Sequence, residues 1–213
     1  MGTEHVHILK WETGQGDGGT QTVFVREWRG DAPGPTLALI GGEHGIELAG
    51  PGGIDLACRD LAGRSFRGSV LAVPAISPPN IRCRNHTFGQ PHGEGYTDAM
   101  PYNTWAKWPG KPDGDPAERL CLLVWAEVIA RADVTLNFHT WSGNSASCFF
   151  TDETVAPMGE IARHFGVPFI DPEDQHPSET LHGHLLARGK PAGLIELQGQ
   201  WQIPVPMMHR VRT

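Results

Sequence analysis

Residues 36–75 read TLALIGGEHGIELAGPGGIDLACRDLAGRSFRGSVLAVPA, within a chain of 213 residues. The run TLALIGG (36–42) is almost wholly apolar, as in a strand that is buried on both faces. The chain then passes through a glycine-rich turn into a helix that we expect to end near Gly63, and a second apolar strand follows at 69–75. This succession predicts a βαβ unit, and therefore a sheet that is at least partly parallel.

The rest of the chain continues the alternation of strands and helices. We expect a strand at 22–28, a helix at 117–132, a strand at 133–139, helices at 153–166 and 176–189, and a last strand at 192–198. Residues 76–116 show no sustained period and are rich in Pro, Gly, Asn and aromatic residues, which favours an ordered, site-forming loop. We therefore predict one α/β domain over residues 1–213, with a mixed, mostly parallel sheet flanked by helices.

Composition argues against several classes of partner. The net charge of -7, the pI near 5.8 and the lack of a basic stripe argue against nucleic acid. No run of about 18 apolar residues is present, so we expect no membrane span. The N-terminus lacks the basic start and apolar run of a secretory signal, and the four cysteines form no C-x-x-C pair. We expect a cytoplasmic protein, and formation of a homo-oligomer stays open.

A histidine and a carboxylate stand three residues apart where the first strand of the βαβ unit ends. His44 and Glu47 can converge there, and open α/β sheets bind ligands at the carboxyl ends of their strands. His139 closes the apolar strand 133–139 and supplies a third ligand from another strand end. Two imidazoles, one carboxylate and a water make a catalytic zinc site. In the alternative, His44 and Glu47 are a helix-capping pair and His139 is a surface histidine.

The segment GGEHGIELAG (41–50) resembles the G-x-H-G-x-E-x-x-G signature of the succinylglutamate desuccinylase/aspartoacylase family, a branch of the zinc carboxypeptidase-like enzymes. Other family motifs are similar, in the same order, to VPAISPPNIRCR (73–84), NTWAKWPG (103–110), NFHT (137–140) and GLIELQG (193–199). The resemblance extends from about residue 22 to residue 199 and so covers most of the chain.

This resemblance implies one zinc ion per chain, held by His44, Glu47 and His139. It also implies that Glu196 is the general base, which takes a proton from the attacking water and passes it to the leaving amine. The alternative for Glu196 is a strand-end carboxylate paired with a cation. Only residues 200–213 follow the last motif, so we expect the fold without the C-terminal β-rich domain that relatives often carry.

The resemblance is looser on the substrate side of the expected site. The family's oxyanion-stabilising arginine corresponds best to Arg84 and next to Arg82, whereas strict counting within the motif reaches His86. Asn103 matches the first residue of the family's Asn-Arg pair, but Thr104 stands in place of the arginine that binds a substrate carboxylate. We expect Arg84 to be catalytic, and Arg82, His86 and Asn103 to bind substrate.

The expected activity is zinc-dependent hydrolysis of an amide bond in a small N-acylated amino acid or amine. One alternative is a zinc carboxypeptidase acting on short peptides, which needs an arginine for the terminal carboxylate. Another is a catalytically degenerate remnant that keeps the metal but has lost turnover. A third is an interaction module without metal. Elemental analysis of the purified protein separates this last alternative from the others.

Overall fold

A computed structural model describes residues 2–13, 19–90, 100, 102–141, 146–170, 179–202 and 205–212. The strands are β1 (Thr3–Glu12), β2 (Thr20–Arg29), β3 (Ala32–Gly41), β4 (Arg67–Val73), β5 (Val134–Thr140), β6 (Cys148–Phe150), β7 (Phe169–Ile170) and β8 (Ala192–Leu197). The helices are α1 (Ala49–Leu61), α2 (Pro78–Cys83), α3 (Pro116–Glu127), α4 (Met158–Phe165), α5 (Leu181–Leu186) and α6 (Val205–Arg212), with a 3-10 turn at Ile129–Arg131.

All the strands belong to one mixed sheet, in the order β1-β2-β4-β3-β5-β8-β6-β7. At its centre β3 pairs in parallel with β4 and β5, and β5 pairs in parallel with β8. The flanking pairs β1–β2, β2–β4 and β6–β8 are antiparallel. The predicted class, a mixed α/β sheet built around a parallel βαβ unit, is confirmed. The carboxyl ends of β3, β5 and β8 consequently meet at one edge of the sheet.

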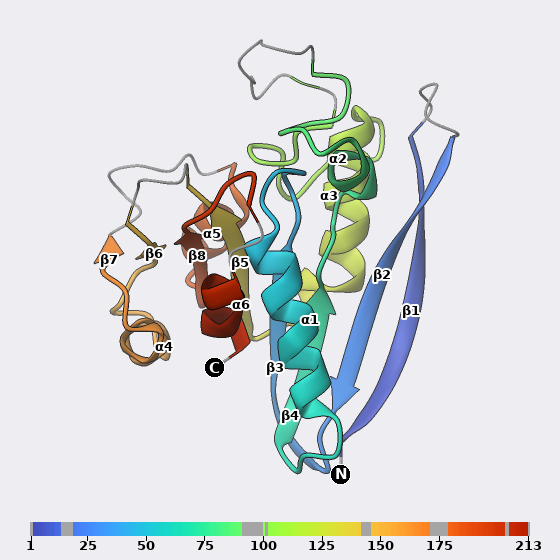
Figure 1. Cartoon of the computed structure of the whole chain (residues 1–213). Coiled ribbons are helices and arrows are strands. Elements are labelled where there is room, and N and C mark those ends of the chain that lie inside the picture. Colours follow the sequence, from blue (N-terminus) through green and yellow to red (C-terminus); the bar gives the residue numbers. More distant parts are fainter. Residues whose placement is uncertain are drawn as a thin grey trace.

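Helices cover both faces of this sheet (Figure 1). Leu120 of α3 and Leu185 of α5 pack into the core on one face, while Ile54 of α1 and Met158 of α4 pack into the core on the other. α6 lies along α1 on the second face (Figure 1). Successive residues of β3 face alternate cores, which explains why its sequence is an unbroken apolar run. None of the described helices is both long and apolar enough to cross a bilayer.

In its described residues, the segment predicted as a loop, residues 76–116, contains one short helix before α3 begins at Pro116. α2 begins with Pro78 and Pro79, which fit the first turn of a helix because their missing N–H groups need no partner there. A helix of six residues is too short to give a periodic signal, so the sequence did not reveal it. Residues 91–99 and 101, within the same predicted loop, lie outside the described residues.

One glutamate is buried in the middle of β2 with its charge balanced. Glu27 is 3% exposed, and its carboxylate accepts hydrogen bonds from His7 at 2.7 Å and Arg29 at 2.7 Å. Arg131 lies 3.0 Å from the same carboxylate. Burial alone would raise the pKa of Glu27, but these three partners outweigh it and lower the pKa to about 2. This cluster stabilises the sheet and is separated from β3 by β4.

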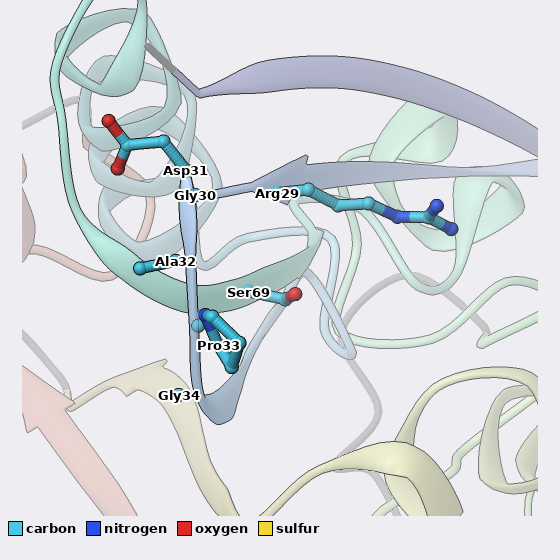
Figure 2. Close-up of a pocket in the computed structure, with 8 residues that line it drawn as sticks. Arg29, Gly30, Asp31, Ala32, Pro33, Gly34 and Ser69 are labelled. Carbon is cyan, nitrogen blue, oxygen red and sulfur yellow. The ribbon is translucent and has the colours of Figure 1, made fainter.

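A hollow of about 350 Å³ lies at the amino end of β3 (Figure 2). Its lining comes mainly from the β2–β3 turn, and in Figure 2 the side chain of Arg29 extends away from Pro33 and Gly34. That side chain is bound to Glu27. The ten residues of β3 put this hollow roughly 30 Å from the carboxyl edge of the sheet. The strand ends converge at the opposite, carboxyl edge, where open α/β sheets bind ligands.

Candidate metal centre

Four ionisable side chains meet where β3, β5 and β8 end. His44 and Glu47 lie in the turn that joins β3 to α1, while His139 and Glu196 are each the last residue but one of their strands. His139 and Glu196 are register partners in the parallel pair β5–β8. All four side chains are buried, with exposures between 2% and 7%. The chain path thus brings residues 44, 47, 139 and 196 together in a place with little access to water.

The carboxylate of Glu47 lies between the two histidines. Its Oε1 is 3.0 Å from Nδ1 of His44, and its Oε2 is 3.1 Å from Nδ1 of His139. The backbone N–H of Thr140 donates to the same Oε2 at 3.0 Å. The imidazole centroids of His44 and His139 are 5.0 Å apart. The two histidines expected to bind zinc therefore each direct Nδ1 at Glu47, one at each carboxylate oxygen.

This arrangement excludes the alternative in which His44 and Glu47 are a helix-capping pair. The N-cap of α1 is Leu48, and no side chain caps this helix. Glu47 instead directs both carboxylate oxygens at histidines. His139 is 2% exposed, so it is not a surface histidine.

The charges of this group depend on one another. Burial alone would raise the pKa of Glu47, but His44 and His139 outweigh it and hold the pKa well below its usual range. Burial would likewise lower the pKa of His139, but Glu47 and Glu43 raise it well above its usual value. Buried carboxylates here need positive charge beside them. Two imidazoles and a carboxylate are the donor set that zinc accepts in catalytic sites, so the residues fit this ion.

Each histidine also meets a polar side chain at its second ring nitrogen. Nε2 of His44 is 3.4 Å from Oδ1 of Asn103, and Nε2 of His139 is 3.4 Å from Oε1 of Glu43. Burial is the largest influence on the pKa of Glu43 and would raise it, but the hydrogen bond and charge of His139, the charge of His44 and the hydrogen bond from Thr104 together outweigh burial and lower the pKa to about 2. Asn103 thus lies behind His44, and its expected contact with substrate stays a prediction.

His86 lies directly against this group. Its ring stacks on that of His44, with centroids 3.7 Å apart and planes inclined by 27°. Ligand atoms of His44, Glu47 and His86 all lie within 4.8 Å of one another. Burial lowers the pKa of His86 to about 3, so this imidazole is neutral. His86 is therefore a geometric alternative to His139 as the third ligand, whereas the sequence indicated a role in substrate binding.

The turn that carries His44 is held against the loop of His86 by a glycine. The backbone N–H of Gly45 donates to the carbonyl oxygens of Asn85 at 3.0 Å and His86 at 3.2 Å. A Cβ atom at this position would overlap the carbonyl oxygen of Asn80. Gly45 therefore permits the close approach of two backbone segments.

We expect Gly45→Ala to lower the free energy of unfolding by about 1–3 kcal/mol or more, because a backbone carbonyl cannot yield as a side chain does. Urea unfolding of the metal-free chain measures this change. Gly52→Ala in α1 is the matched control, since its added methyl group meets only the flexible end of Met208. Equal stability of Gly45→Ala and the parent would show that the two segments do not pack as described.

Glu196 differs from the other carboxylates of the site. Its Oε2 has no hydrogen-bond partner among the described residues, and no described cation forms an ion pair with it. Burial raises the pKa of Glu196 to about 8, against the opposing charge of His139. Among the described residues, Glu196 thus lacks the ion pair that the alternative of a cation-paired strand-end carboxylate requires, although the charge of His139 acts on it. An unpaired buried carboxylate is costly, which indicates a functional reason for its position.

Of the two arginines expected near the substrate, Arg82 is bound to β2 and Arg84 lies at the surface. The guanidinium of Arg82 donates a hydrogen bond to the side chain of Gln21 on β2. Arg84 ends α2 in the left-handed conformation, with a φ of 50°, and is exposed. Neither is in a described contact with His44, Glu47 or His139, and their expected roles stay predictions.

Two contacts of the site were not anticipated from the sequence. Oγ1 of Thr104, the residue in place of the family's arginine, donates to Oε2 of Glu43 at 2.5 Å. The indole of Trp105 lies edge-on to the ring of His139, with centroids 5.2 Å apart. The signal available for Glu43 is an acidic residue next to His44, a candidate ligand, but sequence alone does not show which imidazole ring that residue reaches.

Comparison with known proteins gives one curated relative. It is the N-alpha-acetyl-L-2,4-diaminobutyric acid deacetylase of Halomonas elongata, 27% identical over 107 residues. That alignment spans 50% of this chain and 29% of the deacetylase. No family model matches the chain.

Solved structures match the fold over 98% of this chain. They include the ectoine utilization protein EutE (DoeB) from Ruegeria pomeroyi, with a TM-score of 0.78 at 20% identity, and a succinylglutamate desuccinylase/aspartoacylase from Rhodobacter sphaeroides, with 0.77 at 21%. A metallo-carboxypeptidase from Burkholderia cenocepacia matches with 0.67 at 12%. The chain spans 64%, 62% and 62% of these structures, respectively. The chain therefore has the fold of the succinylglutamate desuccinylase/aspartoacylase proteins, as its sequence motifs predicted.

Proposed function

We propose that this chain is a zinc-dependent amide hydrolase that removes the acyl group from a small N-acylated amino acid or amine. His44, Glu47 and His139 are the proposed ligands of one zinc ion, and Glu196 is the proposed general base. The observation that carries the proposal is the meeting of these four side chains at the carboxyl edge of the sheet. A deacetylase among its relatives, and structural neighbours that are deacylases and a metallo-carboxypeptidase, support amide hydrolysis as the reaction.

The residues of the chain have separate tasks in this reaction. When bound, zinc supplies Lewis acidity, which favours deprotonation of water and polarises a carbonyl oxygen. Glu196, whose pKa is raised in the metal-free chain, would take its ionised form beside the positive charge of a bound zinc ion. The ionised carboxylate accepts the proton of the water that attacks the amide carbon, and returns it to the nitrogen as the carbon–nitrogen bond breaks. Its burial beside His139 places the carboxylate next to the proposed ligands and away from bulk water. The products are a carboxylic acid and an amine.

The proposed substrate is an N-acylated small molecule. The described site offers no fixed arginine, which argues against a peptide held by its terminal carboxylate and equally against an acyl amino acid held by its own carboxylate. Arg82 is bound to Gln21, and Thr104 is directed at Glu43. The name of the curated relative adds an N-acetylated diamino acid as a specific candidate.

A panel of substrates tests this proposal on the zinc-loaded chain. We expect release of amine from N-acetyl and N-succinyl amino acids or N-acetyl diamines, measured with an amine-reactive dye. Short peptides should be cleaved far more slowly at their C-terminal residues. Preferential release of C-terminal residues would instead identify a carboxypeptidase. Full zinc binding without turnover of any panel member would favour the degenerate remnant.

A further inference from the structure

The carboxylate of Glu43 is fully enclosed behind the proposed metal centre. Glu43 is 1% exposed and lies in the turn after β3, next to His44 in sequence. Its Oε1 lies 3.4 Å from Nε2 of His139, on the far side of that ring from Glu47. His139 is therefore held between two carboxylates, with Nδ1 facing Glu47 and Nε2 facing Glu43.

Two donors fix the orientation of the Glu43 carboxylate. The side-chain amide of Asn137 donates to Oε1 at 2.7 Å, and the hydroxyl of Thr104 donates to Oε2 at 2.5 Å. Both donors are buried, with exposures of 1% and 0%. Asn137 lies on β5 two residues before His139, so the same strand carries the ring and a group that orients its partner. The carboxylate held in this way directs Oε1 at Nε2 of His139.

We propose that Glu43 is a positioning residue that fixes the tautomer and orientation of His139 for metal binding. By accepting the proton on Nε2, Glu43 leaves the lone pair of Nδ1 directed at the metal position beside Glu47. Its negative charge also makes the imidazole a stronger electron donor. Thr104 stands where the family has its substrate-binding arginine. In this chain it supports the contact between Glu43 and His139 by donating a hydrogen bond to Glu43. The inference rests on the proposed function, because it assumes that His139 is a ligand.

Zinc affinity is the measurement that tests this role. We expect Glu43→Gln to bind zinc about 10- to 100-fold more weakly than the parent in competition with a chromophoric chelator, because loss of a carboxylate behind a ligand histidine has effects of this size. In the cobalt(II)-loaded protein, the visible d–d absorption should shift in Glu43→Gln. Thr104→Val, which removes only the hydroxyl that holds Glu43, should show a smaller loss of affinity in the same direction.

Glu27→Gln is the matched control. Glu27 is also a buried glutamate that contacts a histidine Nε2, but it lies on β2, beyond β4 from the proposed centre. Its replacement should lower the melting temperature and leave both zinc affinity and the cobalt spectrum at parent values. If the role of Glu43 were purely structural, Glu43→Gln would keep the parent zinc affinity and cobalt spectrum, as Glu27→Gln should.

The outcomes separate this inference from the proposed function. Parent affinity and an unshifted cobalt spectrum in Glu43→Gln, in a parent chain that binds zinc, would overturn the role of Glu43 alone. If Glu43→Gln does not fold, parent zinc affinity in a folded Thr104→Val would overturn it equally. A parent chain that binds no zinc would overturn the proposed function itself, and with it the inference.

Discussion

Glu196→Gln should keep its zinc and its fold while losing most of its turnover. The amide is nearly isosteric with the carboxylate, and Oε2 has no hydrogen-bond partner in the described residues that the substitution would remove. The amide cannot accept a proton from water or return one to the leaving nitrogen. General acid–base assistance contributes about 10²–10⁴-fold, so kcat should fall by that order while KM changes little.

Zinc content and melting temperature must be measured on the same preparation as the kinetics. A loss of turnover with unchanged zinc and unchanged stability reports on the chemical step. Because Glu196 is buried with a raised pKa, a neutral amide at this position should not destabilise the chain. A variant that stays within a few-fold of the parent would show that Glu196 is a structural carboxylate.

His139→Ala and His44→Ala should each lose stoichiometric zinc. Each substitution removes one of three proposed protein ligands, and metal binding is coupled to folding. His139→Ala should also destabilise the metal-free chain by about 3–5 kcal/mol, since Glu43 and Glu47 would be left as buried carboxylates without the imidazole between them. Elemental analysis after gel filtration measures the first effect, and urea unfolding of the metal-free protein measures the second.

His184→Ala provides the matched control for these variants. His184 is also buried, but it lies on α5 and packs edge-on against Trp125. Its loss should cost stability without changing zinc content. If His139→Ala retains full zinc while His44→Ala does not, the third ligand is another residue, and His86 is the first candidate because of its position against His44.

The sequence predicted the centre of the fold well, because that part depends on local patterns. The apolar runs of β3 and β4 and the glycine-rich entry to α1 are consecutive in the chain, and their parallel pairing follows from the crossover helix. The outer elements were harder to predict. β6, β7 and α6 have three, two and eight residues, respectively, and such short segments carry too few residues for a period to appear.

The site was predictable only as far as its residues lie at strand ends. His44, Glu47 and His139 could be chosen because each follows or closes an apolar strand, whereas Glu196 was implied by the resemblance of GLIELQG (193–199) to a family motif. The structure brings the four together. The contact of Glu43 with His139 joins residues that are 96 positions apart and depends on how the turn after β3 is folded. The stacking of His86 on His44 likewise depends on the close approach at Gly45.

The most direct test of the metal centre is an anomalous difference map from a crystal of the zinc-loaded protein, measured at the zinc absorption edge. We predict one peak per chain, about 2.0–2.2 Å from Nδ1 of His44, Nδ1 of His139 and the carboxylate of Glu47. A peak bound by His86 with His139 unattached would contradict this ligand set. No peak at this edge of the sheet, in a protein shown to be folded and saturated with zinc, would contradict the metal centre as a whole.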